Sequence, residues 1–371
     1  MAKYRFEQIA INSTEKKKPV EEDRFTYLGL EHLDSGCLKV TRYGSDVAPI
    51  GEKLVMRKGD VLFGKRRAYQ KKVAIAPFDG IFSAHGMVLR PREEVVDKDF
   101  FPLFISSDYF LDAAIKISVG SLSPTINWRD LKELEFELPN LEEQKRLAAV
   151  LWATNDTIEA YKRLISATDD LVKSQFIEMF GMIDATSLCN MAKVSAGQSS
   201  PYDEEFSATG TPFIKAGDLE SLKKRVISEN DCNLVDNETI IRRKLKLHEK
   251  GTVLVAKSGM SCLSGHVYAL KKPAYIVSHL ACIEPIEGKS TTEYLRWLFI
   301  TCGIKDLIKD PSYPSIQLSQ LNELQIPNAS YSKQLEFSSF ASQSDKSKFE
   351  LEQALSELTA TYKQIISDNL G

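Results

Sequence analysis

The chain carries one sequence pattern twice, and this repetition constrains its fold more than any other feature. The order Pro, Thr or Ser, Ile, then Leu-x-Glu-Leu occurs from Pro124 to Leu134 and again from Pro314 to Leu324. Each copy runs directly into a long helical pattern. A repeat of roughly 190 residues is too long for a solenoid unit and matches a domain plus a connector. The sequence therefore predicts a tandem duplication.

The repeat extends towards the amino terminus of each half. The stretch 58–65 (Lys-Gly-Asp-Val-Leu-Phe-Gly-Lys) matches 250–257 (Lys-Gly-Thr-Val-Leu-Val-Ala-Lys). Ser83-Ala84-His85, before an apolar strand that ends at Pro91, matches Ser278-His279 before a strand that ends at Pro285. Any one of these matches could be chance. Because they keep the same order in both halves, we interpret them as a duplicated frame with different residues between the landmarks.

Two long segments have the periodicity of helices that pack along other helices. From Leu141 to Phe180 there is no Pro or Gly, and apolar residues recur at alternating steps of four and three, as in a coiled-coil seam. Such a helix is roughly 60 Å long at 1.5 Å per residue. A similar pattern runs from Ser332 to about Asn369. We expect the two helices to pair as an antiparallel coiled coil; packing on another subunit is the alternative.

The remaining segments favour short strands. Apolar runs bounded by Gly, Pro and Asp predict strands at 61–63, 73–76, 87–89, 253–255 and 275–277. Helical spacing predicts additional helices over 99–117 and 292–309. The predicted fold class is therefore α+β, with two tandem mostly-β domains, two long antiparallel helices and an internal pseudo-twofold repeat. The expected segments are a first domain at 1–138, a connecting helix at 139–181, a second domain at 182–327 and a carboxy-terminal helix at 328–371.

Composition is that of an ordinary globular chain. Of 371 residues, 43% are apolar and 27% are charged. No run of about 18 apolar residues and no signal-peptide pattern is present, so we expect a cytoplasmic protein without a membrane partner. The six cysteines form no C-x-x-C pair, which argues against a zinc site and for free thiols.

Positive charge is concentrated locally although the net charge is −3. A nucleic-acid surface needs a local positive field, not a positive total. In the first half the basic stretch is opposed within the sequence only by Asp60, and the second half has a comparable concentration. Because the clusters fall at matching places in both repeats, we favour DNA over merely solvated faces. The clusters are Arg57, Lys58, Lys65, Arg66, Arg67, Lys71 and Lys72, and then Lys215, Lys223, Lys224, Arg225, Arg242, Arg243, Lys244, Lys246, Lys250 and Lys257.

Catalytic patterns are missing from the sequence. There is no Walker phosphate loop, no G-x-G-x-x-G after a strand, no Asn-Pro-Pro or Asp-Pro-Pro, no H-E-x-x-H and no G-x-S-x-G elbow. The five histidines are scattered, with no acid or cysteine at a fixed spacing to orient them. We therefore predict no catalytic and no metal-binding residues, and interpret His85 and His279 as DNA contacts.

The order of these motifs resembles the DNA specificity subunit of type I restriction-modification systems. The segment Leu138-Pro139-Asn140-Leu141-Glu142-Glu143-Gln144 is similar to the family's Pro-x-Leu-x-Glu-Gln segment, and the 58–62 turn and the 120–127 loop also look like that family. The resemblance covers essentially the whole chain. The second copy, 327–334, keeps the Pro and the Gln but loses the leucine and the paired acids.

The resemblance implies a non-catalytic scaffold that reads an interrupted, two-part sequence in double-stranded DNA. It implies two target recognition domains, with helices that carry two methyltransferase subunits and that restriction or translocase subunits can join. S-adenosylmethionine is expected on the methyltransferase and no cofactor on this chain. We expect DNA contacts from the repeat-matched loops and histidines: Lys65, Arg66, Arg67, Tyr69, Gln70, His85, Ser121, Ser123, Thr125 and Asn127, and then Lys257, Ser258, Met260, Ser261, Ser264, His279, Ser312, Tyr313, Ser315 and Gln317.

Two other functions remain open from the residues alone. The first is a coiled-coil adaptor that binds proteins through its duplicated domains and has no DNA role. The second is an enzyme with an unfamiliar site, which the missing motifs disfavour. Binding to DNA that strengthens as salt falls separates the DNA reader from the adaptor.

Overall fold

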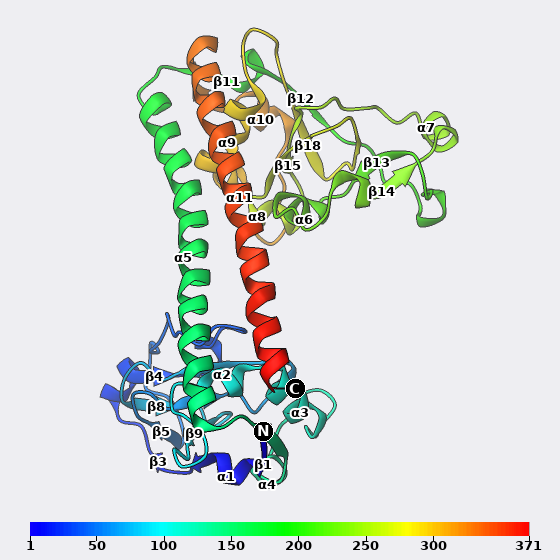
Figure 1. The fold of residues 1–371 in the computed structure, drawn as a ribbon. Helices are drawn as coiled ribbons and strands as arrows, with labels where there is room; N and C mark the ends of the chain where they lie inside the picture. The colour runs from blue at the N-terminus through cyan, green and yellow to red at the C-terminus, as the bar shows by residue number, and fades with distance from the viewer. Residues whose placement is uncertain (371) are drawn as a thin grey trace. The chain divides into compact units, whose positions relative to one another are not determined.

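The computed structural model describes residues 1–370 and divides the chain into two compact units. The first unit contains residues 1–162 and the segment from Gln353 onwards, and the second contains residues 163–352. Each unit combines small sheets, short helices and parts of two long helices (Figure 1). The predicted mixed α+β class with a tandem repeat is confirmed.

The first unit is built around two four-stranded sheets and one two-stranded ribbon. One sheet has the order β2 (Ala10–Ser13), β9 (Met87–Pro91), β6 (Val61–Phe63), β7 (Val73–Ile75), and is antiparallel throughout. The other sheet has the order β3 (Lys16–Lys17), β5 (Lys53–Met56), β8 (Gly80–Phe82), β4 (Tyr27–Leu28), with β4 parallel to β8. The ribbon joins β1 (Ala2–Arg5) to β10 (Glu135–Leu138).

The second unit repeats the four-stranded antiparallel sheet and the ribbon, but its other sheet has three strands instead of four. Its four-stranded sheet has the order β12 (Ala192–Ala196), β18 (Leu280–Pro285), β15 (Val253–Ala256), β16 (Val267–Ala269). A three-stranded sheet pairs β14 (Asn233–Val235) with β13 (Thr211–Ile214) and β13 in parallel with β17 (Tyr275–Ile276). The ribbon is β11 (Ala185–Ser187) with β19 (Gln325–Pro327). Ala10 faces Pro91 as Ala192 faces Pro285, so the landmark prolines occupy equivalent places.

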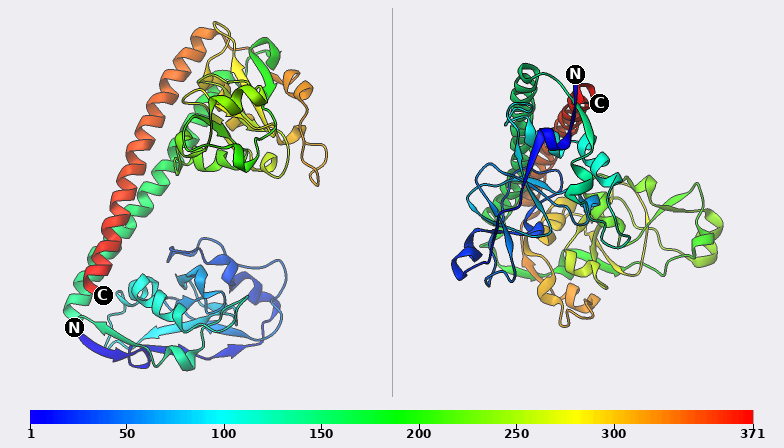
Figure 2. Two further views of the ribbon diagram at one scale, coloured as in Figure 1. Left: turned by 90° about the vertical axis from the view of Figure 1, so that its right-hand side faces the viewer. Right: turned by 90° about the horizontal axis from the view of Figure 1, so that it is seen from below.

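Two helices of 40 residues each, α5 (Leu141–Phe180) and α11 (Tyr331–Leu370), contribute to both units. The bounds predicted for both helices agree with these to within about one residue. In the first unit the start of α5 packs near the end of α11, through Leu151 and Tyr362 among others. In the second unit the end of α5 packs near the start of α11, through Phe176 and Phe337 (Figure 2). The two helices are therefore antiparallel, as expected.

A buried glutamine fixes the first turn of each long helix to its own domain. The Gln144 Oε1 atom accepts a hydrogen bond from the Asp97 backbone N–H (2.8 Å), and its Nε2 donates to the carbonyls of Val95 (3.1 Å) and Pro139 (2.9 Å). Gln144 is 1% exposed, so these bonds satisfy polar groups that have no access to water.

Gln334 makes the same set of bonds in the second unit. Its Oε1 accepts from the Thr291 N–H (2.9 Å), and its Nε2 donates to the carbonyls of Lys289 (2.9 Å) and Ala329 (2.8 Å). Ala329 thus holds the place of Pro139. Sequence matching had aligned Pro139 with Pro327 instead, but Pro327 ends β19 and pairs with Ala185. The residue equivalent to Pro139 is therefore Ala329, two residues after Pro327.

Two predicted short helices were too long. The helix expected over 99–117 is two helices, α2 (Phe101–Ser106) and α3 (Asp108–Lys116), because Ser107 has an extended backbone and its side chain caps α3 by accepting from Phe110 N–H. The helix expected over 292–309 is α9 (Thr292–Cys302), which ends at Gly303 with a φ of 68°. Within residues 1–370, no helix is long and apolar enough to cross a membrane.

We predict that Gln334→Glu lowers the stability of the second unit by about 2–4 kcal/mol at pH 8, because a carboxylate cannot donate to the Lys289 and Ala329 carbonyls. The loss should shrink near pH 5, where a protonated carboxyl can donate to one of them. Calorimetric unfolding measures both effects. Gln343→Leu, at an exposed position of the same helix, is the control and should change stability little. Equal losses in both variants would contradict the role of Gln334.

Candidate nucleic-acid interface

The candidate interface of the first domain consists of two adjacent loops, which we call the 65–71 loop and the 119–127 loop. The Ile126 N–H donates to the Lys65 carbonyl (2.9 Å), and the Arg67 N–H donates to the Pro124 carbonyl (2.8 Å). Arg66 and Thr125 form a bridge between the loops. The backbone of the Pro124-Thr125-Ile126 motif therefore holds the basic 65–71 loop in place.

The second domain builds the same frame from its own copy of the motif. The Ile316 N–H donates to the Lys257 carbonyl (2.7 Å), and the Gly259 N–H donates to the Pro314 carbonyl (3.0 Å). Ser258 bridges to Ser315 as Arg66 bridges to Thr125. These two backbone bonds and the bridge match, while Arg66 and Arg67 are replaced by Ser258 and Gly259. We call these backbone contacts between the two loops the frame. The frame is the same in both domains, whereas the side chains that it carries differ.

A histidine braces each of these loops. In the first domain the Arg66 Nη1 lies 3.3 Å from the His85 Nε2. In the second the Ser258 Oγ lies 2.8 Å from the His279 Nδ1. Burial and the nearby positive charges of Arg66, Lys65 and Lys53 hold the pKa of His85 below its ordinary value of 6.5. Both exposed histidines, predicted as DNA contacts, thus also position the residue that follows the loop lysine.

The other predicted contact residues lie on or beside the two frames. Tyr69 and Gln70 are in the turn 68–70, and Tyr69 is 57% exposed. Met260 immediately precedes α8 (Ser261–Ser264) and is 71% exposed. Asn127 and Gln317 precede α4 (Trp128–Leu131) and α10 (Leu318–Asn322), one in each domain. Ser121 and Ser123 lie in the 119–127 loop and Ser312 and Tyr313 in its counterpart, whereas Ser261 and Ser264 lie in α8.

Sequence analysis predicted Tyr313 as a contact but missed Leu122, an apolar side chain in the 119–127 loop. Leu122 is 92% exposed in the 119–127 loop, and Tyr313 is 83% exposed in the counterpart loop. Leu122 lies among serines and beside the basic 65–71 loop, whereas Tyr313 lies beside the 257–264 loop, in which Lys257 is the one basic residue. Apolar atoms at a DNA-facing tip can contact a thymine methyl group or a base face. A large apolar residue inside an otherwise polar loop was the signal that could have found Leu122.

The local charge surplus is smaller than the sequence indicated. Asp60 is the only acid that the sequence analysis placed within the first basic stretch. Its carboxylate pairs with Arg90 (2.7 Å), which lies outside that stretch. Lys71 pairs instead with Asp108 (2.6 Å) and Asp112 (2.7 Å), and Arg57 lies 3.5 Å from Glu15. These acids come from other elements, so counting charges along a segment could not reveal them.

Two lysines outside the predicted cluster add positive charge near the 65–71 loop. Burial and the charge of Lys16, from β3, lower the pKa of Lys65. Lys53, from β5, is among the charges that lower the pKa of His85. Positive groups from separate strands therefore lie near Lys65 and His85, and one of them, Lys16, also pairs with Glu52 (3.5 Å). Such a concentration favours an anionic ligand.

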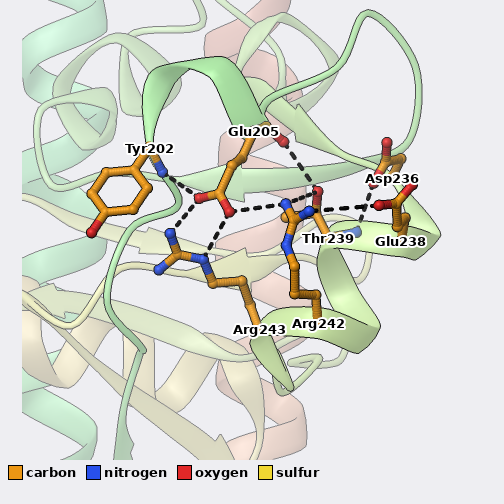
Figure 3. Close-up of polar contacts among 7 residues, drawn as sticks. All are labelled: Tyr202, Glu205, Asp236, Glu238, Thr239, Arg242 and Arg243. Carbon is orange, nitrogen blue, oxygen red and sulfur yellow. Dashed lines mark hydrogen bonds and ion pairs between the residues drawn. The ribbon is translucent and has the colours of Figure 1, made fainter.

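In the second domain, two residues of the predicted basic cluster already pair with an acidic residue of the same domain. Arg242 and Arg243, in α7 (Asn237–Arg243), both bond to the Glu205 carboxylate, and the Arg243 guanidinium lies 4.7 Å from the Tyr202 ring centre (Figure 3). The hydrogen bonds from Arg243 and from the Tyr202 N–H hold the pKa of Glu205 below its ordinary range. These arginines serve to tie α7 to the 202–205 turn.

Comparison with known proteins gives one consistent result. The profile of the family "Type I restriction modification DNA specificity domain" matches residues 14–167 and 185–359. The EcoDI specificity subunit of a type I restriction enzyme from Escherichia coli is 29% identical over 182 residues, which is 46% of this chain and 40% of that protein. The MjaIX specificity subunit from Methanocaldococcus jannaschii is 28% identical over 249 residues, 60% of this chain and 55% of that protein. The chain thus spans about half the length of these relatives, or less.

Two solved structures share the fold. The type I restriction-modification S subunit from M. genitalium has a TM-score of 0.59 at 15% identity, with 100% of this chain and 96% of that chain covered. A chain from a study of complex assembly and conformational transition of a type I R-M system has a TM-score of 0.57 at 19% identity, with 99% and 97% covered.

We predict that Arg66→Ala raises the pKa of His85 towards 6.5, because it removes the nearest of the positive charges that lower it. An NMR titration of the imidazole measures this. Arg57→Ala, which removes a charge absent from the causes of the shift, should leave the pKa unchanged. Since the folded pKa is depressed, the stability contributed by neutral His85 is complete above about 6.5 and falls as the pH drops towards the folded pKa. An unaltered pKa in Arg66→Ala would contradict the brace.

Proposed function

Because the chain belongs to the family of type I restriction modification DNA specificity domains, we propose that it is the DNA-reading subunit of a restriction-modification complex. In this proposal each domain reads one half of an interrupted target in double-stranded DNA. The observation that carries it is the pair of frames at the Pro-Thr-Ile and Pro-Ser-Ile motifs. Their backbone hydrogen bonds are equivalent, but the side chains that they expose differ.

Equivalent frames with different side chains suit a reader of two unlike half-sites. The first domain offers arginine, tyrosine and glutamine next to the 119–127 loop, and the second offers serines, Met260 and Tyr313. Arginine matches guanine edges, glutamine matches adenine, and apolar atoms match the thymine methyl group. The predicted contact residues of both domains keep this role in the proposal, and the half-sites should differ in sequence.

The partners in this proposal are two methyltransferase subunits, which α5 and α11 would carry, with restriction or translocase subunits able to join. The chain itself would be non-catalytic and would bind no cofactor, while the methyltransferase would hold S-adenosylmethionine. The lack of nucleotide-binding and methyltransferase motifs in the sequence supports this division of labour. The functional segments would be 1–138 and 182–327 for reading, and 139–181 and 328–371 for assembly.

Sequencing of DNA methylation in single molecules tests the proposal directly. Cells with the gene should carry a methylated two-part motif, and cells without it should lack that motif. Purified chain assembled with its methyltransferase should shift a duplex that contains the motif, and binding should strengthen as salt is lowered. A methylation pattern that does not depend on the gene, together with no salt-dependent binding, would favour the adaptor function.

We predict that Leu122→Ala and Tyr313→Ala alter different halves of the motif. Each side chain is highly exposed, so truncation should leave the folding of its domain intact. Each variant should weaken binding of the assembled complex about tenfold, equivalent to 1.4 kcal/mol, and relax the sequence of one half-site only. Each variant is the control for the other. If both variants changed the same half-site, the assignment of one domain to each half would be wrong.

A further inference from the structure

Backbone strain occurs at two residues of the 65–71 loop, Arg67 and Lys71. Among residues 1–370, four non-glycine residues have positive φ angles, and all four are basic: Arg67, Lys71, Arg225 and Lys244. Arg67 has φ 55° and ψ 53°, the left-handed conformation. Side chains disfavour this region because the Cβ atom crowds the carbonyl oxygen that follows it, and glycine avoids the conflict. Such strain persists where the surroundings impose it, and it is frequent at functional sites.

The frame requires this conformation in both domains. In the first domain the Arg67 N–H donates to the Pro124 carbonyl (2.8 Å), and the Arg67 carbonyl accepts from the Gln70 N–H (2.9 Å). The counterpart of Arg67 is Gly259, which has a φ of 75° and makes the equivalent bond to Pro314. Glycine is therefore the unstrained solution at this turn, and the first domain has an arginine there instead.

Lys71 provides an internal comparison. It is also left-handed and lies two residues before β7, just as the left-handed Gly265 lies two residues before β16. The side chain of Lys71 has a role in the fold, because it pairs with Asp108 and Asp112. The Arg67 side chain is exposed and makes no hydrogen bond or ion pair with any residue in the described range 1–370. Its neighbour Arg66 is held against His85. Nothing inside the protein explains an arginine at position 67.

We infer that Arg67 is a specificity-determining residue of the first domain and that its ligand is a guanine base in double-stranded DNA. This inference rests on the proposed function. The turn, fixed by backbone bonds, holds the backbone of Arg67 in a defined position, and the planar fork of its guanidinium fits the O6 and N7 atoms of guanine. A phosphate contact, in contrast, would position the domain without selecting a base.

The test uses the chain assembled with its methyltransferase and duplexes that carry the motif found by methylation sequencing. Duplexes with each base pair of the motif changed in turn measure discrimination. Arg67→Gly should have an unchanged or higher melting temperature, because it relieves the left-handed strain. It should lose about tenfold or more of its preference for guanine at one position of one half-site.

Two further variants separate the explanations. Arg67→Lys should weaken the guanine preference, because an ammonium group lacks the planar fork. If Arg67→Gly and Arg67→Lys kept the preference and only lost affinity equally for every duplex, Arg67 would contact a phosphate, which would overturn the inference. Lys71→Gly, the matched control, should keep the preference because its side chain is engaged within the domain. An equal loss in Lys71→Gly would mean that any glycine loosens the loop, and would also overturn it.

Failure of this inference can be told apart from failure of the proposed function. If the wild-type complex methylates no gene-dependent two-part motif, the proposed function fails. If it does methylate such a motif, and the Arg67 variants keep full discrimination or the affected half-site contains no guanine, only the assignment of Arg67 fails.

Discussion

The buried glutamine at the root of each long helix is the interaction on which the architecture depends. Gln144 and Gln334 each make three hydrogen bonds to backbone groups. Two of these groups lie in the segment after β9 or β18, and the third is the carbonyl of Pro139 or Ala329, two residues before the helix begins. Because both helix and domain are bonded to one side chain, the direction in which the helix leaves its domain is fixed. A helix that left at a variable angle could not present a defined surface to a partner.

Backbone hydrogen bonds also hold the 65–71 loop and its counterpart 257–264 in place. In each domain a backbone hydrogen bond from position 67 or 259 to the carbonyl of Pro124 or Pro314 holds the loop against the motif that leads into the helix. Each loop is therefore connected to the long helix of its domain through the repeated motif and the short helix α4 or α10 that follows the motif. Backbone bonds tolerate changes in side chains, so the exposed residues can vary while the geometry stays constant.

Much of the fold could be predicted from the sequence because its signals are local. Heptad spacing without Pro or Gly predicted α5 and α11, and repeated landmarks predicted equivalent domains. The errors arose where a single side chain or a distant partner decides. Ser107 breaks one predicted helix by capping the next, and Gly303 ends another. The acids that neutralise Lys71 and the arginines of α7 come from other elements. The backbone angle at Arg67 leaves no trace in periodicity, and only its match to Gly259 in the structure makes it visible.

Hydrogen exchange measured by mass spectrometry, on the chain assembled with its methyltransferase and with or without the methylated-motif duplex, tests the central claim most directly. The account predicts that DNA slows exchange in 65–71 and 119–127, and in the counterpart segments 257–264 and 310–317, in both domains together. Protection confined to other surfaces, or to one domain while the other is unaffected, would contradict the claim that two equivalent frames each hold one half of the target.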